Sequence, residues 1–299
     1  MSSEREAALA SEPAPTMASE AEPWIIQPKT GTLGEKLREL WRYRYLWWYF
    51  AAENLKSQYR KTTLGWLWML MRIFGTVGLS SIIFGGVLAA PTDGPPYFLF
   101  FVAGTATWTL FERSLLFVTR SLERNRKLVT KVYFPRLILP LSATGTGIAF
   151  FVITLVVMIG ATVYFRWTRG IWYVALGPRL IVALLAAVAA LFVAVSVGLW
   201  TSVLQLRWRD VRMSLRYAMP FWFYLTPIIY PMSRIPEKYH WLVRLNPMSS
   251  IVEAFKWGTL GTGSLHPQSL ITSSIVMAVV FLGGVWFFSR AEAQSIDKI

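Results

Sequence analysis

The chain has 299 residues, of which 55% are hydrophobic, and its formal net charge at neutral pH is +14. A soluble domain of this length would be more polar, so the composition predicts several membrane-spanning segments. The sequence has no cysteine, which excludes disulfides and thiolate metal sites within it. The positive charge does not indicate nucleic-acid binding, because the basic residues cluster beside apolar runs, where anionic lipid surfaces attract them.

The first two segments are polar or mixed in character. Residues 1–34 are rich in Glu and Pro and contain no long apolar run, which predicts a disordered tail rather than a secretory signal. Residues 35–62 combine basic side chains with tryptophans such as Trp41 and Trp47. This mixture favours a helix that lies in the membrane interface. A cytosolic surface helix is the alternative.

Six apolar runs follow, and each is close to the length that crosses a bilayer. The predicted fold class is therefore an all-α membrane protein, with residues 35–299 forming a single transmembrane domain. The fifth run is the weakest, because Arg212 and Arg216 lie in its first turns and Pro220 interrupts it. The six predicted spans cover about residues 64–89, 97–119, 138–165, 180–204, 212–230 and 268–289.

The distribution of Lys and Arg predicts the orientation. With the N-terminus inside, the inner segments hold 19 Lys and Arg residues and the outer segments hold 6. We therefore expect both termini on the cytoplasmic side of the inner or plasma membrane.

Residues 222–260 remain apolar and aromatic although four prolines interrupt them. Irregular backbone at membrane depth persists only where protein or a water-filled cavity surrounds it. We therefore predict two short re-entrant helices on the outer side, with Ser249 or Ser250 as helix N-caps. An interfacial loop with an amphipathic helix is the alternative. The predicted outer gate comprises Pro227, Tyr230, Pro231, Asn246 and Pro247.

The sequence lacks the motifs of an enzyme. It has no G-x-x-x-x-G-K-[ST] phosphate loop, no H-E-x-x-H and no G-x-S-x-G. No carboxylate or His cluster that could move protons or hold a metal is apparent, which disfavours a membrane glycosyltransferase or acyltransferase. We expect no catalytic residue, metal or cofactor in this chain, and the missing phosphate loop leaves it no recognisable way to hydrolyse ATP by itself.

Some polar and aromatic residues inside the spans carry specific predictions. Arg72 and Glu112 would lie at similar depths on antiparallel helices, which predicts an intramembrane ion pair. Snorkelling of Arg72 to the inner interface explains its position equally well. Trp108, Trp200 and Trp222 are candidates for lining a channel along which sugar rings slide.

Four strings of residues, taken in order, resemble one known family. They are YRKTTLGWLW at residues 59–68, NRKLVTKVYFPR at 125–136, LTPIIYP at 225–231 and LNPM at 245–248. Together they are similar to the permeases of type 2 ABC exporters for O-antigen, teichoic acid and capsular polysaccharide. The resemblance covers roughly residues 35–290.

This resemblance implies a homodimer that works with two copies of a separate ABC ATPase, which binds ATP and its Mg²⁺. The implied substrate is a polysaccharide carried on a polyprenyl diphosphate within the membrane lipids. The segment between the second and third spans would couple the two subunits, through Asn125, Leu128, Lys131, Phe134 and Pro135. Plain positive-inside anchoring is the simpler explanation of its charges. A type 2 ABC permease for drugs or small lipids is the alternative function.

Overall fold

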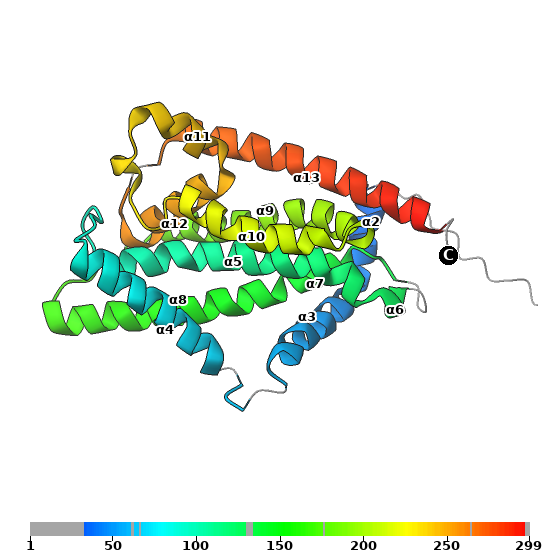
Figure 1. Cartoon of the computed structure of the whole chain (residues 1–299), viewed down its shortest axis with the longest axis horizontal. Helices are drawn as coiled ribbons and strands as arrows, with labels where there is room; N and C mark the ends of the chain where they lie inside the picture. Colours follow the sequence, from blue (N-terminus) through cyan, green and yellow to red (C-terminus); the bar gives the residue numbers. More distant parts are fainter. Residues whose placement is uncertain are drawn as a thin grey trace, which may run out of the picture. The chain divides into compact units, whose positions relative to one another are not determined.

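A computed structural model of the protein describes residues 33–60, 63–65, 67–129, 134–175, 177–263 and 265–296. Within these residues every regular element is a helix (Figure 1). The α-helices are α2 (Leu33–Arg42), α3 (Arg44–Tyr59), α4 (Leu67–Ser80), α5 (Tyr97–Arg124), α6 (Arg126–Val129), α7 (Ile138–Ala143), α8 (Gly145–Arg169), α9 (Arg179–Arg207), α10 (Asp210–Leu225), α11 (His240–Leu245), α12 (Pro247–Leu260) and α13 (Pro267–Ile296). A π-helix, η1 (Ser81–Val87), continues α4, and two 3₁₀ turns, η2 (Met232–Arg234) and η3 (Glu237–Tyr239), precede α11.

Helix α5 is the central element of the bundle. It packs against α8, α9 and α12, and Figure 1 shows it running beside α8 along most of its length. Leu99, Phe111 and Leu115 are each 0% exposed on this helix. Because protein surrounds α5 on several sides, it accommodates hydroxyl groups such as that of Thr119, which bonds to Thr201 of α9 at 2.7 Å.

Four helices of the described chain are long and apolar enough to cross a membrane. They are Leu67–Val87, Ile138–Arg169, Arg179–Arg207 and Pro267–Ala291. Each coincides with one of the six predicted spans. In the second of them, Thr144 separates α7 from α8.

The other two predicted spans differ in length. Helix α5 has 28 residues and α10 has 16. At ~1.5 Å per residue these correspond to about 42 and 24 Å. The prediction that the fifth helix continues to residue 230 is wrong, because α10 ends at Leu225. Pro227 forces the residue before it out of the helical region, and Thr226 has the extended dihedral angles φ −98° and ψ 135°.

The predicted interfacial helix is two helices. Its first residue in the structure is Leu33, two residues inside the predicted tail, and α2 and α3 meet at Tyr43. Helix α3 packs against α7 and α8, with Phe50 and Ala51 buried. The rest of the predicted tail lies outside the described residues.

Candidate functional site

The chain between α10 and α13 contains the predicted gate residues. We call residues 226–263 the connector. It begins with an irregular turn, residues 226–231, continues through η2 and η3, and then forms α11 and α12. Its first part lies near the start of α5, because the Tyr97 hydroxyl donates to the carbonyl oxygen of Ile229 at 2.9 Å. The hydroxyl of Ser233 also donates to the carboxylate of Asp93, at 3.2 Å.

Helix α12 is the buried element of the connector. It packs against α5 and α9 inside the bundle, whereas α11 packs against α13 and α12. Met248 and Val252 are each 0% exposed. The prediction of two short helices in this segment agrees with the structure, and their depth in a membrane stays a prediction.

Asn246 joins the end of α10 to the start of α12. Its Oδ1 accepts hydrogen bonds from the indole Nε1 of Trp222 at 2.9 Å and from the backbone N–H of Met248 at 3.1 Å. Its Nδ2 donates to the Thr226 hydroxyl at 3.0 Å. Asn246 is thus the N-cap of α12, with Pro247 in the first turn.

The predicted caps Ser249 and Ser250 are wrong, since both lie inside α12. The hydroxyl of Ser250 instead accepts a hydrogen bond from Ser273 of α13 at 2.8 Å. Asn246 already caps the start of the helix, with Pro247 after it, so the serines three and four residues after Asn246 are not needed as caps.

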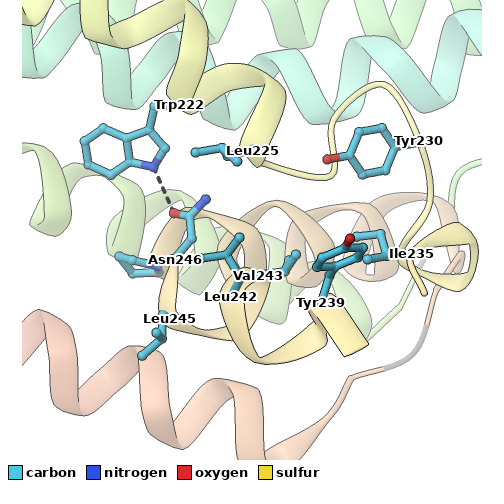
Figure 2. A pocket seen from close by; sticks show the side chains of 10 residues that line it. Trp222, Leu225, Tyr230, Ile235, Tyr239, Leu242, Val243, Leu245 and Asn246 are labelled. Atoms are coloured by element: carbon cyan, nitrogen blue, oxygen red, sulfur yellow. Dashed lines mark hydrogen bonds between the residues drawn. The ribbon is translucent and has the colours of Figure 1, made fainter. Parts of the chain in front are cut away.

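A cavity of about 500 Å³ opens between α10 and the connector. Figure 2 shows the Trp222 indole and Asn246 bonded to each other at one end, and Tyr230 and Tyr239 towards the other. The lining is predominantly apolar, as in most pockets for organic ligands. Its residues are Trp222, Leu225, Tyr230, Ile235, Tyr239, Leu242, Val243, Leu245, Asn246 and Pro247. Of the predicted gate residues, Tyr230, Asn246 and Pro247 line it.

The three tryptophans predicted for a channel lie in different places. Trp222 lines the cavity. Trp108 is 4% exposed and packs edge-on against Trp222 and Phe223. Trp200 donates its indole N–H to the carbonyl of Val280 at 3.0 Å and stacks on Phe287, so it joins α9 to α13.

The predicted partners Glu112 and Arg72 lie on α5 and α4. Charges of both Arg113 and Arg72 act on the Glu112 carboxylate, as does the Trp108 side chain. Arg113 also stacks on the ring of Phe150 at 4.5 Å. Arg72 is exposed on α4. A pair between Arg72 and Glu112 stays a prediction.

The predicted coupling segment follows α5. Asn125 ends that helix, and its Nδ2 donates to the carbonyl of Ser121 at 2.9 Å. Leu128, in α6, is 42% exposed, whereas Phe134 is 6% exposed and lies against Phe50, with ring centroids 5.9 Å apart. Phe134 therefore packs inside the chain, next to Pro135. Lys131 lies outside the described residues.

Two polar residues that the sequence analysis did not select are central to the structure. Gln205 of α9 donates to the Glu123 carboxylate at 3.2 Å and accepts the backbone N–H of Arg212 at 2.9 Å, so it joins α5, α9 and α10. Lys256 of α12 is 4% exposed. A single lysine inside the apolar run IVEAFKWGTL was the available signal for the latter.

Comparisons with known proteins identify the family. The profile of the ABC-2 type transporter family matches residues 45–260, from α3 to the end of α12. An O-antigen export system permease protein RfbA of Myxococcus xanthus is 28% identical over 223 residues, which is 74% of this chain and 82% of the relative. A protein of the same name from Klebsiella pneumoniae is 28% identical over 240 residues, covering 77% and 86% of the two chains. A further K. pneumoniae relative with that name is 27% identical over 247 residues, covering 80% and 89%. Because the family profile spans most of the helical unit, this chain belongs to the ABC-2 type transporter membrane family.

Proposed function

We propose that the chain is the membrane-spanning subunit of an ATP-driven exporter that moves a polyprenyl-diphosphate-linked polysaccharide across the cytoplasmic membrane. The observation that carries the proposal is the similarity to O-antigen export permeases along about three quarters of the chain, with more than four fifths of each relative covered. On this proposal the subunit works as a homodimer with two copies of a separate ATPase.

The charge pattern supports an orientation with both termini in the cytoplasm. Gln205 joins the end of α5, the end of α9 and the start of α10. These helix ends carry four basic residues, which are Arg120, Arg124, Arg207 and Arg212. Basic residues at one end of several helices favour the cytoplasmic side. The connector then lies at the outer side of the membrane, where we propose that it acts as the outer gate.

The connector has the features that a closed gate requires. Helix α12 is buried inside the bundle, and the aromatic cavity beside it is bounded by the predicted gate residues Tyr230, Asn246 and Pro247. Aromatic faces allow weak, sliding contacts with sugar rings. On this proposal an exported glycan leaves the protein through this cavity.

The test of the proposed function is a reconstitution of the permease with its partner ATPase in lipid vesicles. The permease alone should hydrolyse no ATP, and the complex should hydrolyse it faster when lipid-linked polysaccharide is present. Ordinary phospholipids or small lipophilic drugs should give no comparable stimulation. Equal stimulation by such small molecules would favour the drug or small-lipid alternative instead.

Leu128 provides the test of the coupling segment. It is exposed in α6, immediately after α5, so an apolar groove of the ATPase could receive it. We expect Leu128→Asp to weaken ATPase binding about tenfold or more, because an apolar groove would have to bury an unpaired carboxylate. Co-purification of the two subunits at matched expression measures this, and Leu128→Met is the control. Normal co-purification of Leu128→Asp would mean that the segment serves only as a topological anchor.

A further inference from the structure

Lys256 is a buried basic residue to which the proposed function assigns no role. It lies in α12 with 4% of its surface exposed. Its Nζ donates to the carbonyl oxygens of Pro227 at 2.8 Å and of Ile228 at 3.1 Å. Burying an ammonium group is costly unless it is paired and hydrogen-bonded, so this arrangement has to be maintained by its surroundings.

The surroundings form a site for this side chain. Its Nζ lies 3.5 Å from the ring centroid of Phe100 in α5, which is a cation–π contact. Gly104, one turn further along α5, leaves room for the lysine stem, because a Cβ there would lie 2.9 Å from Lys256 Cε. Burial lowers the pKa of Lys256 well below its usual value, and the negative charges of Glu253 and Asp93 oppose this shift only in part.

The carbonyl groups that Lys256 binds belong to the turn at the start of the connector. Helix α10 ends at Leu225, so the carbonyls of residues 227–229 lie beyond its hydrogen-bond ladder. Lys256 takes the first two, and the Tyr97 hydroxyl takes that of Ile229 at 2.9 Å. Three consecutive carbonyls are thus bound by side chains of α12 and α5.

The same contacts bury the turn. Ile228 is 0% exposed, and a Cβ on Gly104 would lie 3.1 Å from its Cγ2. Together with Leu225, the last residue of α10, the turn carries the string LTPIIYP, and Leu225 and Tyr230 of this string line the cavity. A movement that releases the turn from both α12 and α5 has to break the bonds to Lys256 and to Tyr97.

We propose that Lys256 is a positioning residue that holds residues 226–231 against α5 and α12 and so keeps the outer gate closed while no substrate is present. The role as a gate rests on the proposed function, whereas the contacts of Lys256 are the same whatever substrate is exported. The Nζ of Lys256 donates to two carbonyl oxygens, so replacing this lysine with an apolar residue removes both hydrogen bonds at once. The strength of these bonds sets how often the turn leaves α12 when no substrate is present.

Labelling of a cysteine at residue 228 tests this proposal, since the chain has no cysteine of its own. Ile228→Cys is introduced into the full complex, and right-side-out membrane vesicles are treated with a membrane-impermeant maleimide without ATP or substrate. Labelling should be slow in the parent and about tenfold faster with Lys256→Met, because the loss of two buried hydrogen bonds shifts the turn towards its released state. Lys256→Arg, which keeps the charge and the donors, should recover most of the protection.

A matched control is available in the same connector. Lys238 is exposed and also lies over an aromatic ring, with its Nζ 4.8 Å from the ring centroid of Tyr239. Lys238→Met should leave the labelling of residue 228 unchanged. A cysteine at Ala194, which is 0% exposed in α9, should stay unlabelled in all variants, because general unfolding rather than local release would expose it.

The outcomes separate the proposal from a general structural role. Equal labelling of residue 228 with Lys256 and with Lys256→Met would overturn it, as would simultaneous exposure of the Ala194 site. If Lys256→Met does not accumulate in the membrane, Phe100→Leu decides, because it removes the ring beneath the ammonium but retains the lysine. Faster labelling there supports the proposal, and an unchanged rate rejects it. Since cargo is absent throughout, these results are independent of whether polysaccharide is the substrate.

Discussion

Replacing Gly147 with alanine should prevent the chain from folding normally. A Cβ at this position of α8 would lie 2.6 Å from the carbonyl oxygen of Leu110 and 3.0 Å from the backbone nitrogen of Ser114, both in α5. Backbone atoms cannot move aside as a flexible side chain can, so the two helices have to separate. We expect a loss of about 3 kcal/mol or more, at the upper end of overpacking effects. Small residues commonly allow helices to approach closely in membranes.

Gly160 is the matched control, because it lies in the same helix with open space where a Cβ would be added. Gly160→Ala should be neutral or more stable by about 0.5–1 kcal/mol, since alanine favours a helix. Thermal unfolding of the two variants in detergent measures the difference. The fraction of protein that remains monodisperse after heating is the readout. Similar melting temperatures for both variants would show that α8 and α5 are not held together at Gly147.

The sequence predicted the spans well where apolar character alone decides the outcome. The long runs that became α4 with η1, α7 with α8, α9 and α13 exceed the length that a bilayer requires, and few alternatives bury them. The fifth span was predicted to end five residues too late, because apolar character was again the guide. Its apolar residues continue through Ile229, but the backbone restriction imposed by Pro227 ends the helix first.

The sequence indicated which segment and which residues form the candidate site, but not the contacts between them. The prolines indicated the broken connector, and Asn246 and Pro247 were selected as gate residues. The sequence could not show that Asn246 bonds to Trp222, 24 residues earlier, or that Lys256 bonds to Pro227, 29 residues earlier. These pairs depend on how α12 packs inside the bundle, which no local periodicity encodes. Lys256 was therefore counted only as a positive charge of an outer loop.

Phe134 illustrates a different limit. Its position in a basic segment, together with the family resemblance, indicated a contact with a partner subunit. Its side chain instead completes a cluster with Phe50, Leu122 and Ile138 within this chain. In a single sequence, an aromatic residue that contacts a partner subunit looks the same as one that is buried within its own chain. Leu128 is the better probe of docking, because it is exposed in the structure.

Asn246→Ala should markedly destabilise the connector. It removes the N-cap of α12 and leaves the Trp222 indole N–H without its acceptor, whereas the Thr226 hydroxyl still donates to the carbonyl oxygen of Trp222. Loss of a cap costs about 1 kcal/mol, and an abandoned polar group about 1–3 kcal/mol when buried. Because Trp222 is half-buried, we expect about 2 kcal/mol in total. Asn246→Asp should lose less, since its carboxylate still accepts from Met248 and Trp222.

Ser249→Ala is the control for Asn246→Ala, because it lies in the same first turns of α12 and removes only a hydroxyl. The Ser249 hydroxyl is buried without a hydrogen-bond partner among the described residues, so its deletion should be neutral or slightly stabilising. Thermal unfolding of the purified variants gives the order expected, with Asn246→Ala lowest, Asn246→Asp intermediate and Ser249→Ala at the parent value. The polysaccharide exported by cells at equal protein level should follow the same order, because the gate and the cavity share this asparagine. If Ser249→Ala instead melts as low as Asn246→Ala, a serine caps the helix and the junction between α10 and α12 is held by other contacts.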